Sequence, residues 1–191
     1  MRGVPVRRVS GAELLGFRTA IAQVYADAFG TGPWSQDEAG AVRYLERLAA
    51  DAVRPGFVAA LALDGDAVLG FATGWTTPKT FPTGRCYPQV AAGLGAERTA
   101  LWLCGGREVD ELAVHSTARG AGLGAALLDA VSADAPDGRC WLLTSVRAEG
   151  ALAFYRHLGW VQATHPAPEG AGYAAFLGPH HPARTAVPLP I

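Results

Sequence analysis

The sequence has little of several features that mark particular classes of protein. It contains a single lysine, Lys79, and its 16 cationic residues are matched by 17 anionic ones, for a net charge of -1. A chain so balanced has no global positive field with which to hold a nucleic-acid backbone or an anionic membrane. We therefore expect neither partner, and any anion that the protein binds must be held by local groups.

Cysteines and long apolar runs are also scarce. Cys86, Cys104 and Cys140 are an odd number without the paired spacing of a disulfide framework or a metal site. No apolar run approaches the roughly 20 residues that span a bilayer, and the first ten residues lack the apolar core of a signal peptide. These absences predict a soluble, cytoplasmic protein with free thiols and no metal.

What is present is the composition of a folded protein. With 50% hydrophobic and 17% charged residues, the chain lies far from the composition of disordered proteins. Its 191 residues suit one domain with a single sizeable core. We expect that domain over residues 1–178, followed by a loosely held tail over 179–191, where proline and histidine are frequent.

The first part of the chain predicts a strand, two helices and a hairpin. Residues 4–10 alternate apolar and polar side chains, as a strand does. Ser10 and Glu13 have the spacing of a capping box, which starts a first helix. A second helix follows, with its apolar side chains along one stripe. Strands at 56–63 and 66–75 are separated by a tight Asp-Gly turn, so they should pair antiparallel.

The second part predicts a crossover and a closing pair of strands. Strands at 108–116 and 138–146 are separated by a helix, and this order makes two strands parallel. Strands at 160–164 and 172–178 close the sheet. The connection at 76–105 is about thirty residues long, which exceeds an ordinary loop, so it is either a functional lid or an ordered insertion.

The stretch ARGAGLGAAL, residues 118–127, has the features of an anion site. Gly120, Gly122 and Gly124 give access to positive φ and let another molecule approach the main chain. The helix that follows offers unpaired N–H groups at its first turn, and Arg119 adds a permanent planar cation. The stretch therefore predicts a phosphate-bearing ligand, with a pyrophosphate lying across main-chain amides.

Other interpretations of this stretch stay open at this point. It lacks the Lys-Ser/Thr pair of a Walker loop and the glycine spacing of a dinucleotide fingerprint. A glycine-rich turn can also serve only to let a helix pack tightly against its strand. The stretch alone does not decide between a ligand and this structural role.

Two motifs together resemble the GNAT family of N-acetyltransferases. Residues 119–124, RGAGLG, are similar to the family signature R/Q-x-x-G-x-G/A. Residues 151–160, ALAFYRHLGW, resemble its A-x-x-F-Y-x-x-x-G-F segment, with Trp160 in place of the last phenylalanine. The resemblance covers residues 4–178 and implies a mixed α/β (α+β) acyl-CoA N-acyltransferase fold, with a mostly antiparallel sheet, one splayed parallel strand pair and helices on both faces.

This chain departs from the family pattern at two positions near these motifs. Ala148 stands where many members have an asparagine early in the last helix, so that amide cannot hold the cofactor. Ser116 stands where many members have a proline. The insertion at 76–105 matches no general family feature, and it puts substrate selection in doubt.

The resemblance implies acetyl-CoA as cosubstrate and no metal. The main chain of one strand would pair with the pantetheine arm, and the glycine turn would take the pyrophosphate. Carried over to this chain, the cofactor-binding residues are Leu112, Ala113, Val114, Arg119, Gly120, Ala121, Gly122, Leu123 and Gly124.

The reaction that the resemblance implies needs a neutral amine. An alkyl amine with a pKa near 10.4 is deprotonated in only about one molecule in a few thousand at pH 7, so a base is useful. Glu111, and after it Glu108, are the candidate bases, although either carboxylate could simply be solvated at a strand edge. Tyr155 matches the family tyrosine that protonates the CoA thiolate.

We thus expect an acetyl-CoA-dependent N-acetyltransferase that moves an acetyl group to a primary amine by direct attack in a ternary complex. The acceptor would be a small-molecule amine or a peptide amine, and a homodimer is implied by analogy. The alternative is a catalytically silent acyl-CoA-binding regulatory module. A nucleotide-phosphate enzyme is a third possibility, and it would need a metal.

Overall fold

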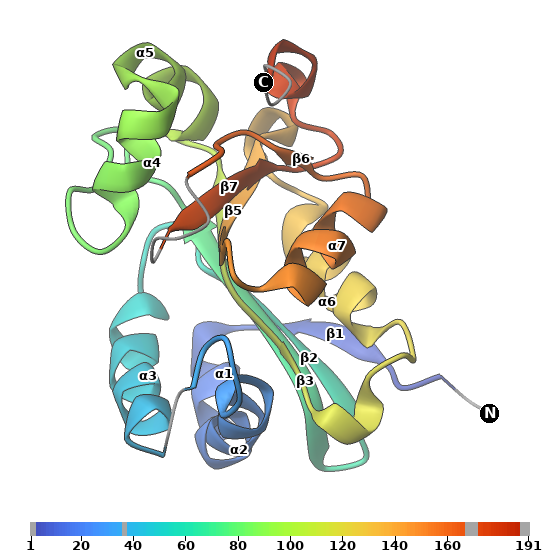
Figure 1. Ribbon diagram of the computed structural model, residues 1–191. Coiled ribbons are helices and arrows are strands. Elements are labelled where there is room, and N and C mark those ends of the chain that lie inside the picture. Colours follow the sequence, from blue (N-terminus) through green and yellow to red (C-terminus); the bar gives the residue numbers. More distant parts are fainter. Residues whose placement is uncertain (1–2, 36–37, 167–171, 188–191) are drawn as a thin grey trace. The chain divides into compact units, whose positions relative to one another are not determined.

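The computed structural model of the protein describes residues 3–35, 38–166 and 172–187 (Figure 1). The chain divides into two compact units. The first unit comprises Met1–Trp75 and Val109–Ala133, and the second comprises Thr76–Glu108 and Asp134–Ile191.

The described residues form seven strands in the order β1-β2-β3-β4-β5-β7-β6. The sheet is mostly antiparallel, and β4 and β5 are its one parallel pair, so the predicted mixed α/β class is confirmed. The strands are β1 (Val6–Val9), β2 (Val58–Asp64), β3 (Ala67–Thr76), β4 (Arg107–Val114), β5 (Cys140–Ser145), β6 (Val161–Gln162) and β7 (Tyr173–Leu177).

The first helix of the first unit begins where the sequence predicts, and it ends earlier than the sequence predicts. Ser10 caps α1 with a complete capping box: its Oγ accepts from the N–H of Glu13 at 3.2 Å, and its own N–H donates to Glu13 Oε2 at 2.8 Å. The helix that follows breaks at Phe17. The unit holds α1 (Gly11–Gly16), α2 (Arg18–Phe29), α3 (Glu38–Asp51), the short 3-10 turn η2 (Ser116–Ala118) and α6 (Leu123–Ser132).

These helices cover both faces of the strands in the first unit. The strands β2 and β3 pair antiparallel as predicted, with Asp64 opposite Ala67. Ala59 and Leu61 share a core with α1, α2 and α3. The α6 helix lies on the other face (Figure 1), where an added Cβ at Gly70 would come within 2.9 Å of Leu127 Cδ1. The alternation of β2 thus buries side chains on both faces.

In the second unit, the long connection at 76–105 is helical and shares a core with the strands. Its Tyr87, Val90 and Leu103 are buried together with Trp141 of β5 and Leu177 of β7. The unit contains α4 (Tyr87–Leu94), α5 (Ala96–Arg98), the π-helical turn Thr99–Leu103, the 3-10 turn Pro136–Gly138, α7 (Glu149–His157) and the 3-10 turn η4 (Pro182–Ala186). The residues at 76–105 are thus an ordered part of this unit.

The expectation of a loosely held tail is wrong for residues 179–187. His181 is buried, and its Nε2 lies 2.9 Å from the carbonyl oxygen of Trp102. The N–H of Ala183 donates to Nδ1 at 3.1 Å, so the neutral ring donates through Nε2. The tail is fixed because this histidine joins it to the insertion. Residues 188–191 lie outside the described part.

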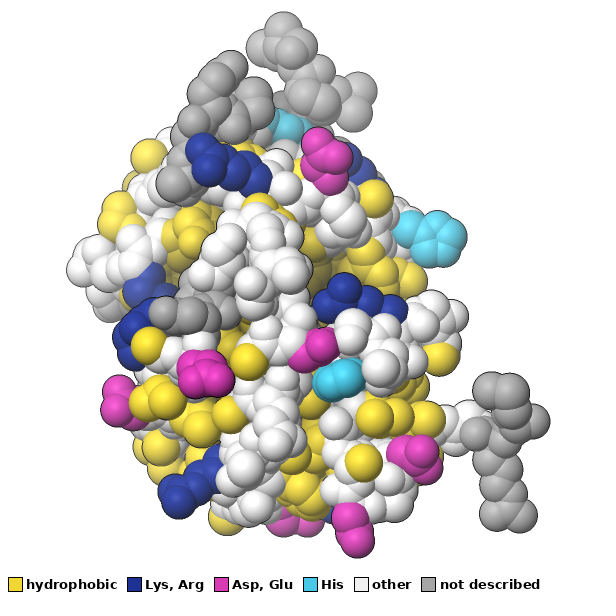
Figure 2. Space-filling model, turned by 60° about the horizontal axis from the view of Figure 1, so that its bottom comes forward, with side chains coloured by type: hydrophobic (Ala, Val, Ile, Leu, Met, Phe, Trp, Pro, Cys, Tyr) yellow, Lys and Arg dark blue, Asp and Glu magenta, His cyan; other side chains and the backbone are white. Residues whose placement is uncertain are grey.

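Two classes of feature are missing from the part of the chain that the structure describes. Over residues 3–35, 38–166 and 172–187, no helix combines the length and apolar character needed to cross a membrane. The same ranges contain no group of three or more His, Cys, Asp or Glu side chains placed to hold a metal ion. On the face shown in Figure 2, charged side chains of both signs are scattered among uncharged ones.

Candidate functional site

The glycine turn of the first unit is held in a left-handed conformation that opens onto free space. Gly120 has φ 79°, and Gly122, the N-cap of α6, has φ 78° and ψ 1°. Side chains rarely adopt this conformation, which glycine adopts readily. A Cβ added at either position would meet no described atom within 4 Å. Packing therefore does not require these two glycines, which removes support for the purely structural interpretation there.

The start of α6 provides donors beside that open space. No side chain caps the helix at Gly122, and no acidic residue lies in its first turn. The opposite side of the helix packs into the protein, where Leu123, Leu127 and Leu128 are buried. Its first N–H groups lack intrahelical partners and carry the positive end of the helix dipole, which together favour an anion.

Arg119 and the preceding strand lie in the same unit as the glycine turn. Arg119 is exposed, and its Nε donates to the carbonyl oxygen of Val114 at 3.4 Å. Leu112, Ala113 and Val114 form the end of β4, and the N–H of His115 donates to the carbonyl oxygen of Leu69 in β3 at 2.9 Å. The predicted cofactor residues 112–114 and 119–124 thus follow one another along a strand, a short turn and a helix start.

Glu111 lies in a cluster of charges that one arginine joins. Arg47 of α3 brings its Nη2 to 3.1 Å from Asp110 and 3.5 Å from Glu111, while its Nε lies 3.5 Å from Asp51. Adjacent side chains of a regular strand point to opposite faces. One nitrogen of Arg47 nonetheless contacts both Asp110 and Glu111. Glu111 is therefore a partly buried, ion-paired carboxylate.

Two stacked tyrosines lie beside this cluster. The rings of Tyr25 and Tyr44 are 4.4 Å apart and nearly parallel, at 9°. Burial, and then the negative charge of Glu111, raise the pKa of Tyr25 to about 12, and the same two causes raise the pKa of Tyr44 well above its ordinary value. Burial and the charge of Asp110 also raise the pKa of Asp51. The cluster thus concentrates negative charge that Arg47 offsets.

Glu108, the other candidate base, belongs to the second unit and is held by the insertion. Only 4% of Glu108 is exposed, and the hydroxyl of Tyr87 donates to its Oε1 at 2.8 Å. The alternative of a carboxylate solvated at a strand edge is therefore wrong for Glu108. Buried charges need hydrogen bonds, and the insertion supplies one.

Tyr155 also lies in the second unit, on α7. It is 9% exposed, and its ring packs against those of Phe154, Trp160 and Phe176, with centroids 5.3 to 6.1 Å apart. Ala148 is the N-cap of this helix, and no side chain caps the helix there. The aromatic surroundings fix the position of the Tyr155 ring.

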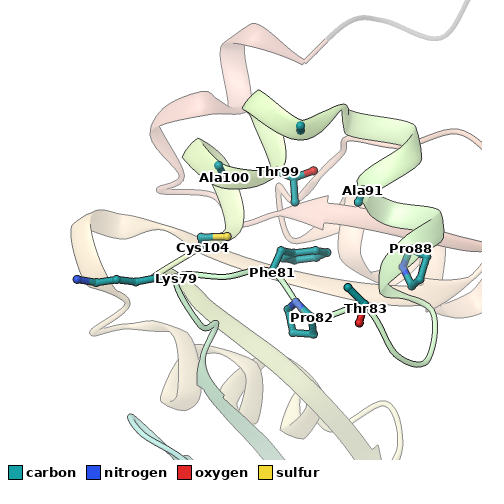
Figure 3. Close-up of a pocket in the computed structure, with 10 residues that line it drawn as sticks. Lys79, Phe81, Pro82, Thr83, Pro88, Ala91, Thr99, Ala100 and Cys104 are labelled. Carbon is teal, nitrogen blue, oxygen red and sulfur yellow. The ribbon is translucent and has the colours of Figure 1, made fainter.

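The second unit also contains a cavity of about 390 Å³ in the insertion (Figure 3). Figure 3 shows the Lys79 side chain reaching away from Phe81. The lining has no carboxylate that could hold a cationic amine, so we do not assign the acceptor to it. The residues that line it are Lys79, Phe81, Pro82, Thr83, Pro88, Ala91, Ala96, Thr99, Ala100 and Cys104.

Sequence reasoning missed the residues that hold the candidates in place. Arg47 is 63 residues from Asp110, and Tyr87 is 21 residues from Glu108, so no local pattern relates them. Asp27 is another, and it contacts Ser116 just before the glycine turn. Arg47 lies four residues from Arg43 and from Asp51, and such a spacing of charges on a helix ordinarily indicates a face exposed to solvent.

Comparison with known proteins identifies the family. Residues 19–160 match the acetyltransferase (GNAT) family. This match spans well over half of the chain, and the chain therefore belongs to that family. A search of curated proteins found no match.

Solved structures share the fold at low identity. The protein is similar to an acetyltransferase from Thermus thermophilus, with TM-score 0.59 and 16% identity over 93% of this chain and 98% of that one. A Corynebacterium glutamicum protein described as histone acetyltransferase HPA2 and related acetyltransferase has TM-score 0.59 and 23% identity over 92% and 95%. The PaiA N-acetyltransferase of Thermoplasma acidophilum, solved in complex with coenzyme A, has TM-score 0.57 and 13% identity over 91% and 97%.

Proposed function

We propose that the protein is an acetyl-CoA-dependent N-acetyltransferase that acts on a primary amine. The observation that carries this proposal is the left-handed turn at Gly120 and Gly122, which opens onto free space at an uncapped helix start. Membership of the acetyltransferase (GNAT) family supports it, as does the coenzyme A complex of the Thermoplasma acidophilum protein.

The residues present fit an acyl-CoA cosubstrate. The main-chain N–H groups at 120–124 and the guanidinium of Arg119 suit a diphosphate, because both are donors and both carry positive charge. The main chain of Leu112, Ala113 and Val114 would pair with the amide groups of the pantetheine arm, which requires no particular side chain. Bound there, acetyl-CoA supplies the activated thioester carbonyl.

The proposed reaction is a direct transfer without a covalent enzyme intermediate or a metal. The neutral amine nitrogen attacks the thioester carbonyl, a C–N bond forms, the C–S bond breaks, and CoA leaves as its thiolate. Glu111 or Glu108 takes the proton that the amine loses, directly or through water. Tyr155 gives a proton to the thiolate, a modest aid since a thiol pKa near 8.5 makes it a tolerable leaving group.

The acceptor is a small-molecule amine or a peptide amine, and we further propose a cytoplasmic location. The three cysteines are free thiols, which suits a reducing compartment. The proposed homodimer rests on analogy alone, and sedimentation of the purified protein at several concentrations would test it.

The experiment that tests the function separates transfer from binding. Calorimetry with CoA and with acetyl-CoA measures binding, and release of free thiol from acetyl-CoA in the presence of a panel of amines measures transfer. We expect saturable binding and amine-dependent thiol release. Saturable binding with no thiol release from any acceptor would favour a silent acyl-CoA-binding module. The absence of binding at millimolar CoA would exclude both.

A further inference from the structure

The segment that leads into the glycine turn is tied to α2 by one carboxylate. Both oxygens of Asp27 are used: Oδ2 accepts from the N–H of Ser116 at 2.6 Å, and Oδ1 accepts from the hydroxyl of Ser116 at 2.8 Å. The Nε2 of His115 lies 3.8 Å from the same carboxylate. Asp27 and Ser116 are 89 residues apart and belong to the same unit.

Ser116 begins the short turn that leads to Arg119 and the glycines. It starts the 3-10 turn Ser116–Ala118, in which the N–H of Ala118 donates to the carbonyl oxygen of His115 at 2.9 Å. The N–H of Arg119 donates to the carbonyl oxygen of Ser116 at 3.4 Å. The next residue is Gly120, whose backbone has the greatest conformational freedom of any residue. Fixing Ser116 therefore limits where Arg119 and the start of the glycine turn can lie.

We propose that Asp27 is a positioning residue that holds the turn at 115–119, so that Arg119 and the main-chain donors of the glycine turn are already in place when the diphosphate of CoA arrives. This inference rests on the proposed function. A segment that is ordered before binding loses less conformational freedom on binding, and affinity rises accordingly. The hydrogen bonds between Ser116 and Asp27 restrict the backbone at residue 116. A proline at that position would restrict it in another way, because its ring fixes φ.

Electrostatics alone gives the opposite expectation, which makes the proposal testable. The charge of Asp27 is close enough to that of Arg119 for the two to interact, and a negative charge there repels a diphosphate. Removal of the carboxylate would then strengthen CoA binding if charge were its only effect. If positioning dominates, removal weakens binding.

The test compares CoA affinities by calorimetry in three variants and the wild-type protein. We expect Asp27→Ala to weaken CoA binding roughly tenfold, because the turn must then be ordered on binding. The matched control is Asp66→Ala, which removes an equal charge from the exposed β2–β3 hairpin of the same unit and should bind as the wild type does.

The third variant asks whether order itself restores affinity. Proline is favoured at the first position of a helical turn, and His115, at φ -53° and ψ 140°, has a conformation that the residue before a proline adopts. We expect the double variant Asp27→Ala with Ser116→Pro to recover most of the lost affinity, although it restores no charge and no hydrogen bond.

Several outcomes would overturn the inference. Wild-type or tighter CoA binding by Asp27→Ala would show that charge outweighs positioning, and failure of the proline to restore affinity would show that order is not what was lost. Should Asp27→Ala fail to fold by circular dichroism, Ser116→Gly, which keeps the N–H and frees the turn, must weaken binding instead. The absence of CoA binding by the wild type would instead refute the proposed function itself.

Discussion

Replacement of Gly122 by alanine tests the idea that the glycine turn faces a ligand. Gly122 has φ 78°, and a Cβ there would meet no described atom within 4 Å. The strain is therefore in the backbone alone, at about 1 to 2 kcal/mol for a left-handed alanine. An alanine also stiffens the unfolded chain by roughly 0.4 to 1 kcal/mol, which adds to the folded-state stability. We expect a net loss of about 1 kcal/mol in the free energy of unfolding.

Gly65 provides a control with the same physics and no ligand. It lies in the β2–β3 hairpin of the same unit, at φ 58°, and an added Cβ there also meets nothing within 4 Å. Gly65→Ala should therefore lower the free energy of unfolding by a similar amount, about 1 kcal/mol. Urea denaturation of both variants measures this.

The two variants should differ only in CoA binding. The methyl group at residue 122 occupies the space proposed for the diphosphate, and relief of the strain would turn the N–H groups away from it. We expect Gly122→Ala to weaken CoA binding by more than about tenfold, which is 1.4 kcal/mol, and Gly65→Ala to leave it unchanged. Equal CoA affinities in calorimetry, with equal losses of stability, would refute the assignment of the open space to the ligand.

Three further predictions concern the second unit. Tyr87→Phe removes the donor to buried Glu108 and should lower the free energy of unfolding in urea by about 1 to 3 kcal/mol. The rate of acetyl transfer should also fall while the affinity for CoA stays the same. An unchanged rate of transfer would argue against Glu108 as the base. Burial lowers the pKa of His181, so the unfolded state binds more protons than the folded state does. The free energy of unfolding should therefore fall as the pH drops below about 6.5. The variant His181→Gln should flatten this pH dependence, and His165→Gln, at an exposed histidine, should leave it unchanged. Burial raises the pKa of Cys140 to about 12, so iodoacetamide at pH 8 should leave it unmodified in the native protein, as peptide mass spectrometry would show.

The features that the sequence predicted correctly are determined by neighbours along the chain. The Ser10–Glu13 capping box and the β2–β3 hairpin each depend on a few adjacent residues, and the glycine turn can be recognised because positive φ is nearly specific to glycine. The parallel orientation of β4 and β5 followed from connection rules that apply to any βαβ unit.

The features that it missed depend on contacts between distant residues. Arg47 contacts both Asp110 and Glu111, and nothing near Arg47 in the sequence indicates this. The tail was expected to be loosely held because proline and histidine are frequent in it. The buried ring of His181, which hydrogen-bonds at both nitrogens, holds it instead.

The shared core of the second unit restricts how this chain can be shortened. The insertion buries Tyr87 and Val90 against Trp141, and Tyr87 is also the donor to Glu108. Deletion of residues 76–105 would expose the indole of Trp141 to water. It would also leave the buried carboxylate of Glu108 without the hydrogen bond from the Tyr87 hydroxyl. The segment at 76–105 is thus a structural part of the second unit, and removing it would cost the unit both part of its core and the hydrogen bond to Glu108.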